Sequence, residues 1–129
     1  MPEWLSPGWA EAAAALSGQL PEVPGLTGTV SLSLQVAPRK EVAIHWSYQD
    51  GRPVPGSAGP APDADLALTL AAADAADVLS GRVEPSVSFM RGRLKATGDG
   101  KLLLGFLEST TSPAFEQWRQ GVAALAPLP

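Results

Sequence analysis

The sequence lacks cysteine altogether and has a single histidine, His45, among its 129 residues. It can therefore form no disulfide, and it cannot supply the cysteine and histidine ligands of the usual zinc sites. Basic residues are also few, 9 against 13 acidic ones, which gives a net charge of -4. A nucleic-acid-binding domain normally carries a basic face, so we expect no nucleic-acid partner. No sequence motif indicates a metal or a cofactor.

Long hydrophobic runs are missing too, because no apolar stretch approaches the roughly 18 residues that cross a bilayer. The N-terminus has an acid, Glu3, where a secretory signal has basic residues, and the C-terminus carries no peroxisomal address. We therefore expect a cytoplasmic, soluble protein that contacts membrane surfaces at most transiently. Asparagine is absent and isoleucine occurs once, a composition that GC-rich bacterial codon usage explains.

The chain has the length of one domain, and we expect residues 1–129 to form a single unit. Ser6 and Pro7 are a typical helix start, so the N-terminal segment, residues 1–19, is predicted to form a helix that begins at Pro7 and ends near Leu20. Two stretches then alternate between apolar and polar residues, at 29–36 and 42–48. They predict an antiparallel hairpin with one polar face.

Later segments change from alternation to helical spacing. Prolines 53 and 55 make the segment from Arg52 to Pro55 a poor edge strand. The predicted elements after it are a strand at 65–70, helices at 72–80 and 85–92, a strand around 94–96, a helix capped by Asp99 and a terminal helix within 112–125. This order predicts an α+β sandwich, a mixed sheet with helices on one face.

The segment from Asp74 to Leu107 is the most informative part of the chain. It is rich in apolar residues but has no nucleophile beside a base and no cluster of metal ligands. This favours a cavity for an apolar ligand over a catalytic site. The helix after Asp99 has more apolar surface than one packing stripe needs, which suits contact with both a sheet and a ligand. An ordinary buried helix, or a buried strand, explains the same run equally well.

The same segment carries a spaced pattern of glycine, proline and aromatic residues. Its members are Asp74, Leu79 (displaced by one position), Gly81, Pro85, Phe89, Gly92, Leu94, Lys95, Gly98 and Asp99. In this pattern the sequence resembles the sterol carrier protein type 2 family, and the preceding hairpin, the turn at Asp50-Gly51 and the strand at 65–70 fall in the family's order. The resemblance covers about residues 20–107.

The resemblance implies a five-stranded, mostly antiparallel sheet whose helices enclose an apolar tunnel. It also implies a non-catalytic carrier of fatty acids, fatty acyl-CoA or similar lipids. Carried over by position, the ligand-binding residues are Leu79, Phe89, Leu103, Phe106 and Leu107 on the helices and Ile44, Trp46 and Leu68 on the strands. Phe115 and Trp118 would lie on the terminal helix, which can act as a lid.

A local basic patch provides candidates for binding a ligand's head group. Five of the nine basic residues lie between Arg82 and Lys101. Arg91, Arg93 and Lys101 would anchor a carboxylate, a CoA phosphate or an anionic membrane surface. The alternative is a solvated strand face and turn.

Other signals give no support for an enzyme. His45 alternates onto the strand face opposite Ile44 and Trp46, where no nearby acid orients it and water is expected to surround it. The run Gly98–Lys101 lacks the first glycine and the Ser/Thr of a phosphate-binding loop. We thus expect a lipid carrier without catalytic activity. One alternative is an accessory interaction domain whose tunnel is filled by side chains, and a more distant one is an acyl-thioester hydrolase.

Overall fold

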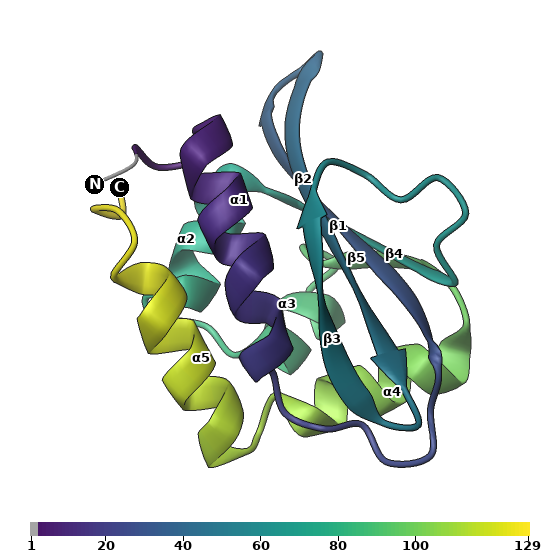
Figure 1. Ribbon diagram of the computed structural model, residues 1–129. Helices are drawn as coiled ribbons and strands as arrows, with labels where there is room; N and C mark the ends of the chain where they lie inside the picture. Colours follow the sequence, from purple (N-terminus) through teal and green to yellow (C-terminus); the bar gives the residue numbers. More distant parts are fainter. Residues whose placement is uncertain (1–2) are drawn as a thin grey trace.

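The computed structural model describes residues 3–129 (Figure 1); residues 1–2 of the predicted N-terminal segment lie outside the described residues. The elements follow in the order α1 (Pro7–Leu16), η1 (Ser17–Gln19), β1 (Gly28–Ala37), β2 (Lys40–Gln49), β3 (Arg52–Ala58), β4 (Leu66–Ala71), α2 (Ala72–Leu79), α3 (Pro85–Met90), β5 (Lys95–Gly98), α4 (Gly100–Ser109) and α5 (Pro113–Ala123). This is the order that the sequence predicts.

The five strands form one mixed sheet in the order β3-β2-β1-β4-β5. Only β1 and β4 pair in parallel, because the chain crosses the sheet after β3 and enters β4 on the far side of β1. The other pairs are antiparallel, so the predicted fold class is confirmed. In the register, Leu32 of β1 lies opposite both Ile44 of β2 and Leu68 of β4, which aligns three apolar side chains across the sheet centre.

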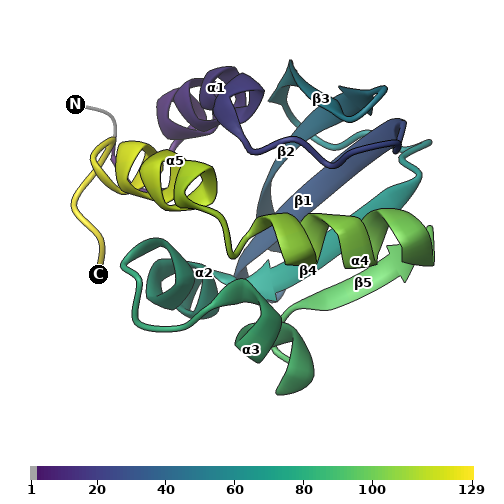
Figure 2. The same cartoon turned by 90° about the horizontal axis from the view of Figure 1, so that it is seen from below.

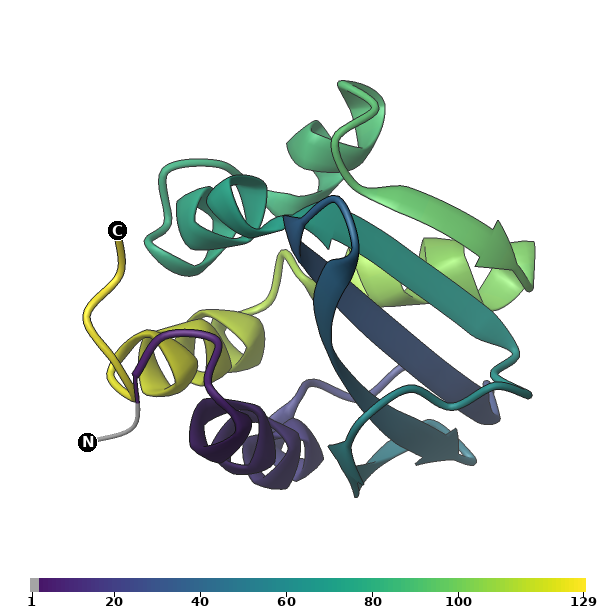
Figure 3. The same cartoon turned by 90° about the horizontal axis from the view of Figure 1, so that it is seen from above.

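The helices pack on the sheet face that these three residues share. Figures 2 and 3 show α1, α2 and α5 gathered together on one side of the sheet, while α4 lies along β4. Their apolar side chains and the inward residues of the strands are buried together in the core. The period-two alternation of the strands and the spacing of three to four residues in the helices turn the apolar side chains of both layers toward each other.

The opposite face of the sheet is partly covered by the loop that follows β3. The His45 Nδ1 atom lies 3.0 Å from the carbonyl oxygen of Gly59. The Ser31 hydroxyl accepts a hydrogen bond from the Ala61 backbone N–H at 3.4 Å. His45 is therefore half-buried under this loop rather than fully solvated, which corrects the sequence-based expectation. Tertiary packing of the loop decides this exposure.

Side-chain caps set the starts of three helices. The Ser6 hydroxyl accepts from the Trp9 N–H at 3.2 Å, and the Asp99 carboxylate accepts from the Lys101 N–H at 2.9 Å. The Ser112 hydroxyl accepts from the Phe115 N–H at 3.3 Å at the start of α5. These caps satisfy backbone donors that have no partner within the helix. The predicted helix starts are confirmed, although α1 ends at Leu16 and continues only as the 3-10 turn η1.

The edge strand β3 is longer than its two prolines suggest, because Pro53 keeps a paired position opposite Tyr48 and a bulge accommodates Pro55. Pro55 and Gly56 together lie opposite Trp46, between the paired positions on either side. A proline lacks the N–H that a regular ladder position requires, and a bulge leaves one residue unpaired. The Gly56 N–H instead donates to the Ser17 hydroxyl of η1 at 3.4 Å. The turn η1 thereby protects the sheet edge.

Gly56 is required at this bulge for steric reasons. A Cβ atom there would lie 1.8 Å from the carbonyl oxygen of His45. We expect Gly56→Ala to lower the free energy of unfolding by about 2 kcal/mol or more, since backbone atoms must separate. Chemical denaturation measures this change. Gly100→Ala is the control, because a Cβ at Gly100 meets no atom within 4 Å; an equal loss in both variants would contradict this explanation.

Candidate functional site: an apolar cavity between sheet and helices

An apolar cavity of about 80 Å³ lies between the helical layer and the sheet. Three central strands supply its floor, namely Leu32, Leu34, Ile44, Trp46, Leu68 and Leu70. The helices and the segments beside them supply the remaining lining residues, Trp9, Ala13, Ala75, Val78, Leu79, Pro85, Leu94, Phe106, Phe115, Trp118 and Val122. The cavity surface is apolar throughout, so hydrocarbon is the ligand chemistry that its walls accommodate best.

Seven of the ten residues that the family resemblance assigns to ligand binding line this cavity. They are Ile44, Trp46, Leu68, Leu79, Phe106, Phe115 and Trp118. The alternation of β2 and β4 and the helical spacing of α5 bring them together from five separate elements. Their geometric convergence agrees with the expected arrangement, while their role in binding stays a prediction.

Phe89, Leu103 and Leu107 lie outside the cavity lining. Phe89 and Leu103 are half-buried and pack against the core, and Leu107 is buried within it. The short helix α3 presents Pro85 to the cavity in place of Phe89. On α4 only Phe106 faces the cavity. The leucines of this helix pack elsewhere in the core or reach the surface. The binding role assigned to these three residues stays a prediction.

Sequence reasoning missed the contribution of α1 to the cavity. Trp9 and Ala13 line it from that helix, one turn apart. Both belong to the apolar helix face that the sequence shows, and a signal for burial was therefore present. Nothing in the local sequence distinguishes burial against neighbouring side chains from burial against a void.

The cavity is bounded by aromatic rings on both layers. The ring centroids of Trp46 and Phe106 lie 6.1 Å apart, which joins β2 to α4, and those of Phe115 and Trp118 lie 5.4 Å apart on α5. Within residues 3–129, the indole N–H groups of Trp9, Trp46 and Trp118 are buried without a hydrogen-bond partner. Each unpaired buried donor costs about 1 to 3 kcal/mol.

Tyr48 lies two residues after Trp46 on β2. Its pKa is the most strongly altered among the ionisable groups of the described residues. Burial raises the pKa of its hydroxyl to about 12. The nearby indole of Trp46 opposes this rise without reaching hydrogen-bond geometry. The hydroxyl is neutral at physiological pH, and Tyr48 does not line the cavity. We therefore assign it a structural role.

The predicted head-group residues lie away from the cavity. Arg91 and Arg93 line a separate polar pocket of about 150 Å³ together with Asp74 and Asp77. Arg93 pairs with Asp74 at 3.7 Å, and Asp77 pairs with Arg82 at 3.0 Å. Lys101 is exposed at the start of α4. The pocket and the cavity have no lining residue in common, and the head-group role of the three residues stays a prediction.

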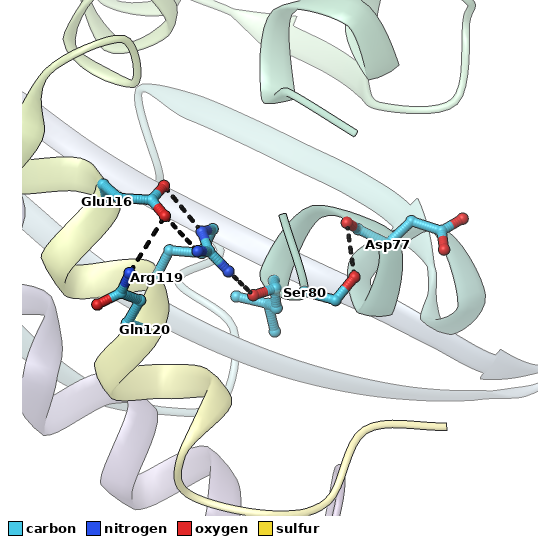
Figure 4. A network of polar contacts seen from close by, with 6 residues as sticks. Asp77, Ser80, Glu116, Arg119 and Gln120 are labelled. Atoms are coloured by element: carbon cyan, nitrogen blue, oxygen red, sulfur yellow. Dashed lines mark hydrogen bonds and ion pairs between the residues drawn. The ribbon is translucent and has the colours of Figure 1, made fainter. Parts of the chain in front are cut away.

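A larger groove of about 370 Å³ adjoins the cavity where the α4–α5 junction faces the turn after α2. The groove and the cavity share Val78, Pro85 and Phe115 as lining residues. The groove also contains Arg119, which hydrogen bonds with Glu116 (Figure 4). This contact lowers the pKa of Glu116 and raises that of Arg119. The groove thus combines an apolar wall with charged groups.

The cavity volume limits what the site holds without rearrangement. Cavities of about 150 Å³ admit benzene, and pockets for larger ligands span roughly 300 to 1,000 Å³. At about 80 Å³ the cavity accommodates only a short piece of hydrocarbon. A long acyl chain therefore requires the helices to move away from the sheet or the chain to extend into the adjoining groove.

Every residue that lines the cavity, within the part of the chain that the structure describes, is apolar. Within residues 3–129 no group of three or more His, Asp or Glu side chains could hold a metal ion. In the same range no helix is long and apolar enough to cross a membrane.

Comparison with solved structures gives matches that cover from two thirds to nearly all of the chain. A protein of Thermus thermophilus described as a possible sterol carrier protein has a TM-score of 0.68 at 21% identity, covering 98% of this chain and 92% of its own. A sterol carrier protein 2 structure has a TM-score of 0.67 at 21% identity, covering 93% and 97%. A palmitated sterol carrier protein 2-like protein of Aedes aegypti has a TM-score of 0.52 at 15% identity, covering 65% and 72%. These matches establish the fold.

The family assignment comes from the sequence. The model of the SCP-2 sterol transfer family matches residues 11–107, which is most of the chain. No curated protein matches the sequence. The chain belongs to the SCP-2 sterol transfer family, and its architecture is a lipid-binding and lipid-transfer fold.

The raised pKa of Tyr48 predicts a loss of stability at alkaline pH. In the unfolded chain the hydroxyl ionises near pH 10, whereas in the folded protein it ionises near pH 12. The unfolded state therefore loses its proton first, and stability falls by about 3 kcal/mol between these two values. Unfolding measured from pH 8 to pH 12 should show this fall, and Tyr48→Phe should reduce it.

Tyr48 is the only tyrosine, so the ultraviolet absorbance of phenolate reports its ionisation directly. A titration midpoint near pH 10 in the folded protein would contradict the burial argument.

Proposed function

We propose that the protein is a non-catalytic lipid carrier, which holds the hydrocarbon chain of a fatty acid or a fatty acyl-CoA between its sheet and its helices. The observation that carries this proposal is the wholly apolar cavity at the centre of the fold. Its floor of leucine, isoleucine and tryptophan side chains offers dispersion contacts without any polar group that would need to be desolvated. The Aedes aegypti neighbour, which is palmitated, has the same fold and supports the choice of ligand class.

Burial of the hydrocarbon chain supplies enough free energy for the ligand to bind. Each buried CH₂ group contributes about 0.8 kcal/mol, so a dozen such groups contribute roughly 10 kcal/mol before costs. Loss of translational and rotational freedom, ordering of the chain and separation of the helices offset a large part of this gain. The remaining free energy corresponds to binding in about the micromolar range.

In this proposal α5 acts as a lid. Phe115, Trp118 and Val122 lie on one face of α5 and close the cavity from the side opposite the strands. Movement of α5 away from the sheet would enlarge the space and join it to the groove through Phe115. The contacts of α5 are with α1, α2 and η1, so its displacement breaks no strand pairing.

The small cavity volume also favours a second candidate, an accessory interaction domain that binds no lipid. Native mass spectrometry of the purified protein separates the two candidates. A carrier should retain about one lipid per chain, identified after organic extraction. A mass without lipid, together with failure to bind a fluorescent fatty acid, would support the accessory domain.

A variant that fills the cavity tests where the lipid binds. Ala75 of α2 is buried and lines the cavity, so Ala75→Leu places three further carbon atoms into a space of about 80 Å³. We expect it to weaken the binding of a fluorescent fatty acid at least tenfold, because the chain and the new side chain compete for the same space. Fluorescence titration measures the affinity.

The matched control is Ala73→Leu, the same change on the exposed side of α2. It should bind the fatty acid as the unchanged protein does. Equal affinity for Ala75→Leu and Ala73→Leu would place the lipid elsewhere. Circular dichroism verifies that both variants keep the fold.

A further inference from the structure

Arg119 is the only basic residue that lines the groove beside the cavity, within the part of the chain that the structure describes. It lies one helical turn after Phe115, whose ring lines both the groove and the cavity. Residues four apart share one face of a helix, so the guanidinium group and the aromatic wall are presented together. A cation thus lies where the apolar interior meets water.

The guanidinium group is held in place by hydrogen bonds to α2 and to its own helix α5. Its Nη1 donates to the carbonyl oxygen of Leu79, at the end of α2, over 2.5 Å. Its Nε donates to the Glu116 carboxylate at 3.0 Å, and Nη2 donates to the same carboxylate (Figure 4). A Cβ at Gly81 would lie 3.2 Å from the Arg119 Cζ, so the bare glycine backbone leaves space for the guanidinium plane.

The Arg119 side chain is only 13% exposed, whereas that of its partner Glu116 is 55% exposed. A guanidinium has five N–H donors, and three of them have partners here. Hydrogen bonds from a desolvated cation to an anion are stronger than those on an open surface. Glu116 is the more exposed partner, so its carboxylate regains hydration when a competing anion displaces it from the cation.

The other polar groups of the groove are less suited to an anion. The hydroxyls of Thr110, Thr111 and Ser112 donate to backbone carbonyl oxygens of α4. Glu84 and Glu116 are acids that lie exposed at the groove. An anion that enters the groove therefore has Arg119 as its one available charged donor and Glu116 as its competitor.

We propose, on the basis of the lipid-carrier function, that Arg119 binds the anionic head group of an amphiphile whose hydrocarbon tail lies in the cavity. The head group replaces Glu116 as the partner of the guanidinium, and the Glu116 side chain turns into solvent. The tail passes the shared wall formed by Val78, Pro85 and Phe115. The head-group chemistry is a carboxylate or a phosphate, which a fatty acid and an acyl-CoA respectively supply.

The test compares ligands that differ only at the head: dodecanoic acid, its uncharged methyl ester and dodecanoyl-CoA. Affinities are measured by displacement of a neutral fluorescent hydrocarbon probe. Arg119→Gln should weaken binding of dodecanoic acid about tenfold and change binding of the methyl ester less than twofold. Glu116→Gln, which keeps the cation and removes its competitor, should tighten binding of the acid several-fold. An effect on dodecanoyl-CoA but not on the free acid would assign the site to phosphate.

Two controls make the outcome decisive. Arg39→Gln removes the same charge in the exposed turn between β1 and β2 and should leave all affinities unchanged.

Equal weakening of acid and ester by Arg119→Gln, with no gain from Glu116→Gln, would overturn the proposal and leave Arg119 as a structural contact between α5 and α2. Weakening of the acid by Arg93→Gln instead would move the anchor to the other pocket. Failure of the unchanged protein to bind the uncharged ester would contradict the carrier function itself.

Discussion

The structure depends on one packing constraint: the helical layer and the sheet meet through apolar side chains that do not fill the space between them. Protein interiors normally pack as densely as organic crystals, so an empty apolar volume is unfavourable. At about 24 cal/mol per Å³, a cavity of about 80 Å³ costs about 2 kcal/mol. Five helices, three central strands and three tryptophans border this space, and a bound hydrocarbon would restore the missing contacts.

Much of the architecture could be predicted because local rules agree with the final fold. Alternation placed Ile44 and Trp46 on the inward face of β2, and the caps at Ser6, Asp99 and Ser112 marked the helix starts. The family pattern added the five-stranded sheet. The edge strand was underestimated, because the bulge at Gly56 and its contact with Ser17 join residues that are far apart in sequence.

The site itself was predictable only in part, since its details depend on tertiary geometry. Periodicity identifies a buried face, but it does not show whether that face meets another side chain or a void, as Trp9 and Leu103 illustrate. Arg119 carries no sequence signal, because a glutamate three residues earlier makes it look like an ordinary surface pair. Its contact with Leu79 spans 40 residues of chain. The basic patch between Arg82 and Lys101 was the stronger sequence signal, yet its arginines lie beside acids.

The central claim is that hydrocarbon enters the space between the sheet and the helices, and nuclear Overhauser effects measure this contact directly. With a saturated fatty acid bound, the account predicts cross-peaks from the chain methylenes to the rings of Trp46 and Phe106, which lie on opposite layers of the cavity. Cross-peaks confined to exposed apolar residues such as Met90 and Leu104, with none to Trp46 or Phe106, would contradict it.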